Sequence, residues 1–206
     1  MTTNYEPEVR DLFGALPDPT GAELRVLHDR LADRADADGL LDVAYRTLDT
    51  PVGTLLLAAT GTGLVRVAYD TEGHDRVLAT LAARISPRIL HAPKRLDAAA
   101  REIEEYFAGR RRGFDLPLDL SLSTGFRRTV LGHLADIGYG RTASYAAVAA
   151  AAGNPRAVRA VGTACATNPL PVVVPCHRVV RSDGSFGGYL GGPAAKRALL
   201  ALEAAA

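Results

Sequence analysis

The stretch SYAAVAAAAGNPRAVRAVGTACAT, residues 144–167, contains two short helical patterns separated by Gly153 and Asn154. Pro155 stands where the first turn of the second helix tolerates a proline, because an N–H group there has no intrahelical partner to lose. Two short helices joined by a glycine-bearing turn are a helix-turn-helix candidate. Helix pairs of this kind are also common in protein cores, so the pattern alone does not establish DNA binding.

The stretch VVVPCHRVV, residues 172–180, follows and places Cys176, His177 and Arg178 between two runs of β-branched residues. A short apolar run of this composition predicts a buried strand. Neighbouring side chains of a strand point to opposite faces, so a direct hydrogen bond between the cysteine and the histidine requires a turn at Pro175. Without that turn the two groups communicate through water.

Cys176 is a candidate nucleophile, because a nearby base or positive charge lowers the pKa of a thiol and yields the reactive thiolate. A free cysteine taken alone is more often a small buried hydrophobe. A histidine base needs an acceptor on its other ring nitrogen, and beyond residue 121 only Asp136, Asp183 and Glu203 are acidic. Glu203 ends the apolar stripe of the last helix and is either carried toward the core or solvated at a frayed end. The sequence leaves both alternatives open.

The remainder of the chain predicts a mixture of strands and helices. Apolar runs broken by TPVG and TGTG predict an antiparallel meander over residues 42–70. This first part shows no cysteine and no cluster of polar residues that suggests chemistry. Further elements are expected as helices at 74–85, 94–108, 126–138 and 193–204, a strand at 88–92, a connector at 114–125 and a glycine-rich loop at 181–192. The loop has no nucleotide phosphate-binding motif.

Residues 1–41 are interpreted as an N-terminal helical extension. Leu24, Leu27 and Leu31 recur at helical spacing behind a capping residue, Thr20. This apolar stripe either docks on the body of the protein or holds a partner, and we expect docking. The sequence therefore divides into the extension at 1–41, an N-terminal domain at 42–121 and a C-terminal domain at 122–206.

Charge and cysteine content narrow the class of protein. The net charge of the 206 residues is +1, but residues 122–206 carry +6 and the rest −5. A basic half suits contact with an anionic polymer and is weak evidence by itself. Cys165 and Cys176 form neither a CxxC pair nor a disulfide framework. No apolar run is long enough to span a membrane, and the N-terminus lacks the features of a signal peptide. We expect a cytoplasmic protein without membrane contact.

Four segments together carry a resemblance to a known family. They are GRTASYAAVAAAAGNPRAVRAVGTA at 140–164, NPLPVVVPCHRVV at 168–180, GSFGGYLGG at 184–192 and AAKRALLALE at 194–203. In this order and spacing they resemble the O6-alkylguanine-DNA alkyltransferases. The segments YRTLDTPVG and EIEEYFAG resemble the N-terminal domain of that family. The resemblance implies an α+β fold: a ribonuclease-H-like α/β domain with a small antiparallel sheet, then a mostly helical, winged-helix-like DNA-binding domain carrying the active-site cysteine.

The resemblance implies DNA repair by direct reversal. The cysteine matching Cys176 takes the alkyl group from the O6 atom of guanine, keeps it and acts once, without cofactor or metal; activity on O4-alkylthymine is left open. His177 matches the base that removes the thiol proton through water, and Glu203 the glutamate that binds this histidine. Asn168 matches a residue that ties the recognition helix to the active-site strand. Tyr189 matches a tyrosine that donates to the departing oxygen. Lys196 occupies a supporting position, and Arg178 is expected to have a structural ion-pair role.

The implied partner is double-stranded DNA containing O6-alkylguanine, bound by a monomer. The target base must leave the stack; Tyr145 matches the residue that favours its rotation, and Arg159 the arginine that fills the vacated place. The recognition helix faces the minor groove. Small residues that suit such a surface are Ala157, Ala160, Gly162 and Ala164.

The substrate pocket is expected to be lined by Pro171, Val179, Tyr189, Leu190 and Gly191. Two positions depart from the pattern of the family. Cys165 stands where a larger apolar residue is common, and Leu190 where a small polar residue occurs. Some members bind zinc through cysteine and histidine in the N-terminal domain; no cysteine precedes Cys165, so no such site is predicted.

Two other classes of function compete with this interpretation. A cysteine hydrolase or acyl transferase built on Cys176, His177 and Glu203 would turn over. A non-repair sensor or regulator would use the same helix-turn-helix without chemistry, although its cysteine would not need to be kept.

Overall fold

The computed structural model describes residues 19–205. Its first layer is a four-stranded sheet in the order β3-β2-β1-β4. The strands β1 (Val43–Thr50), β2 (Gly53–Ala59) and β3 (Leu64–Tyr69) form the predicted antiparallel meander. The fourth strand, β4 (Ile89–His91), pairs in parallel with β1, so the sheet is mixed and only three of its strands are antiparallel. The reason is the intervening helix, which returns the chain to the same end of the sheet.

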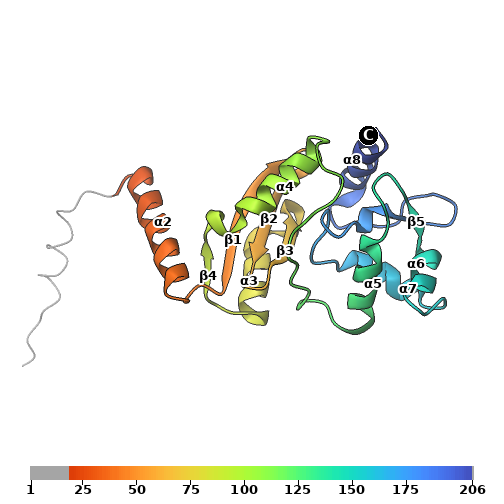
Figure 1. Ribbon diagram of the computed structural model, residues 1–206, viewed down its shortest axis with the longest axis horizontal. Helices are drawn as coiled ribbons and strands as arrows, with labels where there is room; N and C mark the ends of the chain where they lie inside the picture. The colour runs from red at the N-terminus through yellow and green to blue at the C-terminus, as the bar shows by residue number, and fades with distance from the viewer. Residues whose placement is uncertain (1–18, 206) are drawn as a thin grey trace, which may run out of the picture.

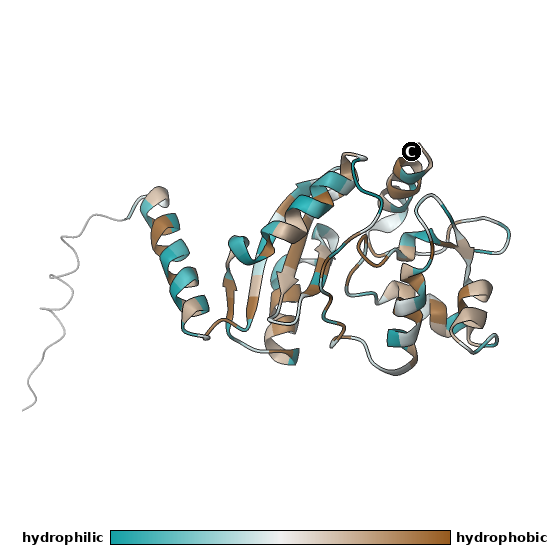
Figure 2. Cartoon of the chain, viewed as in Figure 1, coloured by the Kyte–Doolittle hydropathy of each residue, from teal (hydrophilic) through white to brown (hydrophobic). Residues whose placement is uncertain are grey.

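Two helices cover the two faces of the sheet (Figure 1). Helix α3 (His74–Arg84) follows the 3-10 turn η1 (Asp70–Glu72) and packs Val77 and Leu81 against one face. Helix α4 (Asp97–Phe107) follows the 3-10 turn η2 (Pro93–Leu96) and packs on the other face. The strands are hydrophobic along most of their length (Figure 2), as expected for a sheet covered on both sides.

The C-terminal half is mostly helical. It contains α5 (Gly125–Ala135), β5 (Ala143–Ser144), α6 (Tyr145–Ala151), α7 (Val158–Ala166), the 3-10 turn η3 (Cys176–Arg178), β6 (Val179–Val180) and α8 (Gly192–Ala204). The predicted helix pair is present as α6 and α7. Pro155, however, lies in the turn between them, because α7 begins three residues later at Val158. The whole molecule is α+β, as predicted.

The edge of β3 holds the two halves together. The N–H of Leu64 donates to the carbonyl of Pro117 in the connector at 2.8 Å, and the N–H of Val67 donates to the carbonyl of Pro169 at 2.8 Å. Gly63 permits this approach: a Cβ atom there would lie 2.2 Å from the oxygen of Pro117. The unpaired backbone groups of an edge strand thus find partners within the chain. One continuous apolar core extends from the sheet into α5, α6, α7 and α8.

The prediction of a strand over residues 172–180 is wrong. Val172 has a φ of 74°, which β-branched residues rarely adopt, and the valines lie in turns. Only Val179–Val180 is a strand, paired in parallel with β5. Pro171 and Pro175 explain the difference, because a proline has no N–H to give to a sheet. The apolar composition reflects burial rather than an extended conformation.

Helix α2 (Gly21–Ala37) begins with a capping box in which Thr20 and Glu23 satisfy each other's backbone N–H groups. The expected docking of its leucine stripe is wrong. Leu24, Leu27 and Leu31 are each more than half exposed, because the helix meets the body only near its C-terminal end (Figure 1).

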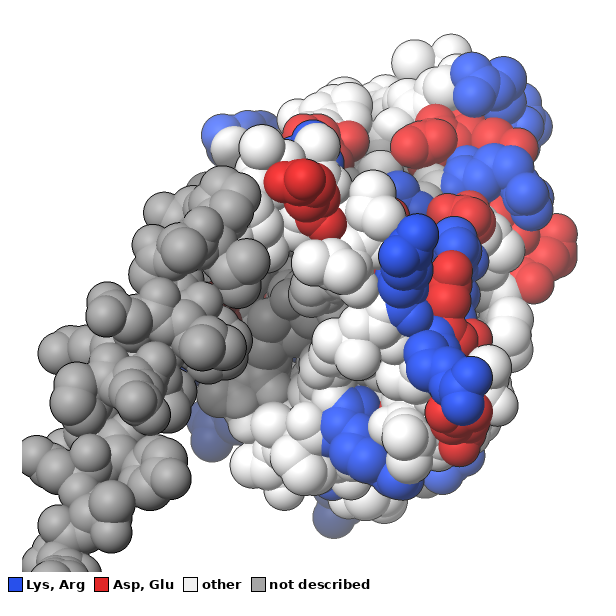
Figure 3. All heavy atoms as spheres, turned by 90° about the vertical axis from the view of Figure 1, so that its left-hand side faces the viewer, with Lys and Arg blue, Asp and Glu red and all other residues white. Residues whose placement is uncertain are grey.

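The contact of α2 with the body is small. Ala32 and Ala35 are its only buried residues, and Asp33 pairs with Lys94 at 2.6 Å. Basic and acidic side chains alternate over the visible part of this end of the molecule (Figure 3). This face therefore lacks the single sign of charge that binding to a polyanion favours. Among residues 19–205 no helix has the length and hydropathy of a membrane span.

Candidate active site

Cys176 lies at the start of the 3-10 turn η3 and is 2% exposed. Pro175 precedes it and ends the regular pairing of the backbone. The side chain of Asn168 donates from Nδ2 to the Cys176 Sγ at 3.1 Å. Cys176 is therefore held at a turn. A turn at this point is what a direct hydrogen bond between Cys176 and His177 would require.

Asn168 uses all of its side chain to fix this segment. The same Nδ2 group donates to the carbonyl of Val174 at 2.9 Å, and Oδ1 accepts from the N–H of Leu170 at 3.0 Å. Asn168 comes directly after Thr167, the C-cap of α7, and is fully buried. Its hydrogen bonds connect the end of α7 to the chain around the cysteine, in the arrangement that the resemblance implies.

Burial raises the pKa of the Cys176 thiol to about 11, and the hydrogen bond from Asn168 and the charge of Lys196 only partly oppose this. The thiol is therefore protonated at neutral pH in the DNA-free protein. Lys196 is itself buried and donates to the carbonyl of Val179 at 2.6 Å. Reaction as a thiolate requires a group that accepts the proton.

His177, the residue after Cys176, is completely buried. Its Nε2 atom lies 2.9 Å from Oε1 of Glu203. Burial lowers the pKa of the histidine, while the glutamate opposes this in part. A neutral imidazole next to a carboxylate carries its proton on the nitrogen that faces the carboxylate. The other nitrogen, Nδ1, is then free to accept a proton, and it is buried without a hydrogen-bond partner among the described residues.

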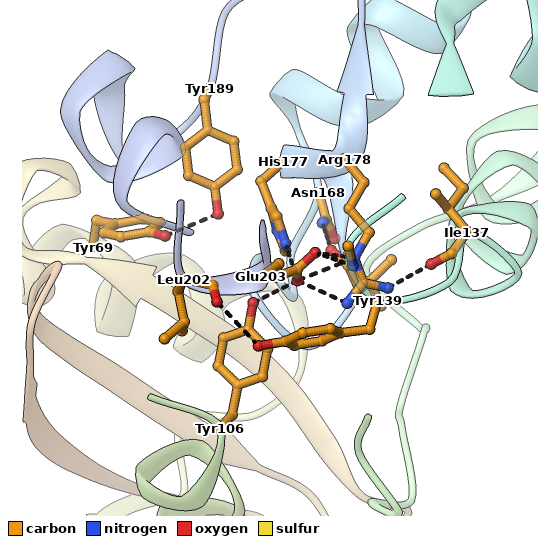
Figure 4. A network of polar contacts seen from close by, with 12 residues as sticks. Tyr69, Tyr106, Ile137, Tyr139, Asn168, His177, Arg178, Tyr189, Leu202 and Glu203 are labelled. Atoms are coloured by element: carbon orange, nitrogen blue, oxygen red, sulfur yellow. Dashed lines mark hydrogen bonds and ion pairs between the residues drawn. The ribbon is translucent and has the colours of Figure 1, made fainter. Parts of the chain in front are cut away.

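Glu203 is the centre of a polar network, shown in Figure 4. Arg178 donates to it from Nε at 3.0 Å and from Nη2 at 2.8 Å. Tyr106 donates at 2.7 Å, and the N–H of Gly140 at 3.2 Å. Burial alone would raise the pKa of Glu203, but the hydrogen bonds from His177 and Arg178 outweigh it and hold the pKa at about 2. The glutamate is ionised and buried, not solvated at a frayed end.

Arg178 has the structural ion-pair role that was expected. Besides the glutamate it binds the carbonyl of Ile137, and its guanidinium lies 5.8 Å from the centre of the Tyr139 ring. Because a buried charge without a partner is costly, Arg178 and Glu203 are needed together. The pair connects η3 to α8 and to the end of α5.

Tyr69 and Tyr189 come from different elements and meet beside His177. Tyr189 lies in the glycine-rich loop with its ring centre 6.3 Å from that of His177. Its hydroxyl is 2.9 Å from the hydroxyl of Tyr69, which is on β3. Tyr145, at the start of α6, is partly buried, and this burial raises the pKa of its hydroxyl.

The expected pocket residues are placed unevenly. Cys165, Pro171 and Val179 are buried around η3, whereas Leu190 and Gly191 are partly exposed in the glycine-rich loop. Leu190 also lines a cavity of about 430 Å³ between the two halves, whose wall includes four arginines. Those arginines are Arg66, Arg76, Arg84 and Arg127.

Helix α7 presents a small-residue face to solvent. Arg159 and Ala160 are exposed, and Ala157 and Gly162 are partly exposed. Ala164 is buried, so its assignment to this surface is wrong. The helix is amphipathic, and its Val161, Ala164 and Cys165 pack inward against the site.

Sequence reasoning missed the contribution of the N-terminal half. Tyr106 and Tyr69 reach the site although that half showed no polar cluster. The available signal was the tyrosine hydroxyl itself: Tyr106 follows Ala99 and Ile103 at helical spacing on a buried face. A buried tyrosine hydroxyl usually has a hydrogen-bond partner. Within residues 19–205, His, Cys, Asp and Glu side chains form no group of three or more that could hold a metal ion.

Comparison with known proteins gives consistent matches for both halves. Residues 43–120 match the family model described as 6-O-methylguanine DNA methyltransferase, ribonuclease-like domain, and residues 125–205 match the DNA binding domain of the same name. The methylated-DNA–protein-cysteine methyltransferase of Methanosarcina barkeri is 38% identical over 77% of this chain and 96% of its own length. The protein of the same name from Mycobacterium tuberculosis is 40% identical over 78% of this chain and 92% of its own length.

Solved structures agree with these matches. The crystal structure of Mycobacterium tuberculosis OGT in complex with DNA is similar with a TM-score of 0.69 and 38% identity. The similarity covers 79% of this chain and 93% of that chain.

Proposed function

The chain belongs to the 6-O-methylguanine DNA methyltransferase family and repairs DNA by direct reversal, and we propose that Cys176 is the residue that accepts the alkyl group. The supporting observation is the buried thiol, with Asn168 donating to its sulfur next to a neutral histidine that is fixed by an ionised glutamate. Cys165 is also buried, but these polar contacts are made by Cys176.

In the proposed reaction the Cys176 proton passes through a water molecule to Nδ1 of His177. Glu203 keeps the proton of the imidazole on Nε2 and stabilises the positive charge that forms. The thiolate then attacks the carbon of the O6-alkyl group. A sulfur–carbon bond forms while the carbon–oxygen bond breaks, and the electron pair of the broken bond stays on the O6 atom of guanine.

Tyr189 is proposed to donate its hydroxyl proton toward this oxygen. A donor placed where negative charge develops lowers the barrier more than it stabilises the substrate. The ring of Tyr189 meets the ring of His177 edge-on. Tyr189 is therefore on the same side of the site as the proposed proton acceptor, His177. The product thioether is stable, so each protein molecule reacts once.

The proposed substrate is double-stranded DNA that contains O6-alkylguanine. The exposed face of α7, with Arg159 and Ala160, suits close approach to a groove. We assign to Arg159 the filling of the place that the flipped base leaves, and to Tyr145 the outward rotation of that base. Ala157 and Gly162 complete the surface of small residues.

The proposed pocket for the extruded guanine is formed by Pro171, Val179 and Gly191, with Cys165 and Leu190 as the two departures from the family pattern. The carbonyl of Val179 is fixed by Lys196. This lysine is assigned a supporting role.

Three further points are part of the proposal. The chain divides into an extension at 1–41 and domains at 42–121 and 122–206, which is supported by the confinement of the four-stranded sheet to residues 43–91. The protein acts as a monomer and in the cytoplasm. The competing functions of a hydrolase and of a sensor are not favoured by the names of the relatives.

The test is a titration with O6-methylguanine duplex under conditions where substrate exceeds protein. We expect one equivalent of guanine restored per protein molecule and no further reaction. Cys165→Ala should retain this stoichiometry, and Cys176→Ala should lose it while still binding duplex. Continued turnover, or loss of the reaction with Cys165→Ala alone, would contradict the assignment.

A further inference from the structure

Tyr69, the last residue of β3, stands in contact with the active site although it comes from the N-terminal sheet. Its side chain is buried, its hydroxyl is 2.9 Å from that of Tyr189, and the two rings meet edge to face with centres 5.8 Å apart. Figure 4 shows the pair beside His177 and Glu203. Neither the residue pattern nor the family resemblance pointed to this position.

We propose that Tyr69 is a positioning residue for alkyl transfer: its hydroxyl donates to the oxygen of Tyr189 and thereby leaves the Tyr189 proton for the departing guanine oxygen. The inference rests on the proposed function, in which Tyr189 is the donor. It adds a residue of the other domain that decides how this donor is oriented.

The backbone around Tyr69 is held firmly. Its N–H donates to Oε1 of Glu72 at 3.0 Å, and Glu72 pairs with Arg66. Arg66 in turn donates to the carbonyl of Pro169 at 3.2 Å. Since the neighbouring Val67 binds that same carbonyl, the end of β3 is fixed to the segment that follows Asn168. The contact between the two domains therefore fixes the backbone from which the ring of Tyr69 extends.

The glycine-rich loop is shaped to fit this ring. A Cβ atom at Gly191 would lie 2.5 Å from Cζ of Tyr69, closer than real contacts allow. In the structure the absence of a Cβ atom at Gly191 lets the loop approach the ring of Tyr69. Tyr189, in the same loop, thereby lies against the end of β3.

The direction of the hydrogen bond is part of the proposal and follows from the role assigned to Tyr189. Two hydroxyls share one hydrogen bond, so one of them donates and the other keeps a proton for a second partner. Both hydroxyls are neutral, because burial raises the pKa of Tyr69 and of Tyr189 far above neutral pH. If Tyr189 donated to Tyr69, it would have no proton left for the substrate. If Tyr69 donates, Tyr189 keeps its proton, and accepting a hydrogen bond strengthens it as a donor.

The first test is Tyr69→Phe, which keeps the ring against Gly191 and removes only the hydroxyl. At saturating O6-methylguanine duplex we expect the rate of transfer to fall about tenfold, the effect of losing one hydrogen bond. The dissociation constant for duplex and the melting temperature should stay close to those of the wild type. Tyr45→Phe, on β1 of the same sheet and beside His91, is the matched control and should change nothing.

The second test separates a positioning role from a structural one. In a Tyr189→Phe background the added Tyr69→Phe should have no further effect, because there is no donor left to orient. Methylation of Cys176 by iodomethane, in a Cys165→Ala background, should be insensitive to Tyr69→Phe, since iodide leaves without a proton donor.

The outcomes are distinguishable from failure of the proposed function. If the wild type takes no methyl group from duplex, the proposed function falls. If the wild type is methylated and Tyr69→Phe reacts at the same rate, the inference alone is overturned. It is also overturned if Tyr69→Phe slows iodomethane and duplex equally, or if the effects of the two substitutions simply multiply.

Discussion

At the scale of single residues, the carboxylate of Glu203 both orients His177 and holds a buried ion pair with Arg178. Its Oε1 atom fixes the tautomer of His177 and also receives Arg178 and Tyr106. Loss of its charge would leave a buried guanidinium unpaired, which costs more than the net contribution of the intact pair. We therefore expect Glu203 to support the fold as well as the proposed reaction.

Glu203→Gln should destabilise the protein by about 3–5 kcal/mol at neutral pH, the usual cost of breaking a buried ion pair. The pKa of Glu203 is lowered from an ordinary value of 4.5 to about 2, so the folded state favours the carboxylate. Its stabilisation is fully present above that ordinary value and is lost as pH falls through the window between the two pKa values. Urea unfolding at a series of pH values measures this.

The difference in unfolding free energy between wild type and Glu203→Gln should narrow as pH is lowered through that window. A difference that stays constant from neutral pH into the acid range would show that the carboxylate is not held ionised by the fold.

Asn168→Ala removes the hydrogen bond from the side chain to the carbonyl of Val174 and the hydrogen bond to the sulfur of Cys176. Since that bond favours the thiolate, the pKa of Cys176 should rise further, and transfer from O6-methylguanine duplex should slow by about tenfold or more, as for loss of a hydrogen bond to a charged group. Single-turnover kinetics at saturating duplex gives the rate, and circular dichroism verifies the fold. An unchanged rate in a folded variant would remove Asn168 from the site.

At the scale of elements, helix α7 links the proposed DNA contact to the proposed chemistry, because its outer face carries Arg159 and Asn168 follows its C-cap, Thr167. Arg159→Ala should slow transfer from duplex by roughly tenfold, the effect of about 1.4 kcal/mol, and leave transfer from free O6-benzylguanine unchanged, because the free base needs no extrusion. Arg101→Ala, an exposed arginine of α4, changes the net charge equally and should not slow duplex repair. Equal loss with both substrates would mean that Arg159 supports the fold instead.

Helices were more predictable than the cysteine segment for a physical reason. The period of α4 and the cap of α2 are local features, and both are found where the sequence placed them. The valines before Cys176 have the composition of a strand, yet Asn168 and two prolines shape them into turns. A hydrogen bond from a side chain six residues away is not visible in a window of β-branched residues.

At the scale of the whole molecule, the two halves form one site on one core. Tyr106 and Tyr69 come from the N-terminal half, and both bind residues of the C-terminal half. The family resemblance indicated Cys176, His177 and Glu203 as the reacting group, while the partners from the other half depend on how α4 and β3 dock and could not be read from spacing. The +6 charge of the C-terminal half overstates its surface charge by one, because Arg178, Lys196 and Glu203 are all buried.

We expect the N-terminal extension to be dispensable for stability and for alkyl transfer. Helix α2 buries two alanines and forms exposed ion pairs, which contribute little to stability. Removal of residues 1–37 should lower the melting temperature by no more than about 4 °C, as for about 1 kcal/mol in a chain of this size. The rate of transfer from duplex should be unchanged. A large loss of activity in a folded truncated protein would show that the exposed leucine stripe serves the reaction.

Mass spectrometry of the intact protein tests whether Cys176 takes and keeps the alkyl group. After incubation with excess O6-methylguanine duplex, the account predicts a single added methyl group, located on the peptide that contains Cys176, with no change at longer times. An unmodified mass in a folded sample that binds the duplex, or a methyl group on the peptide of Cys165, would contradict it.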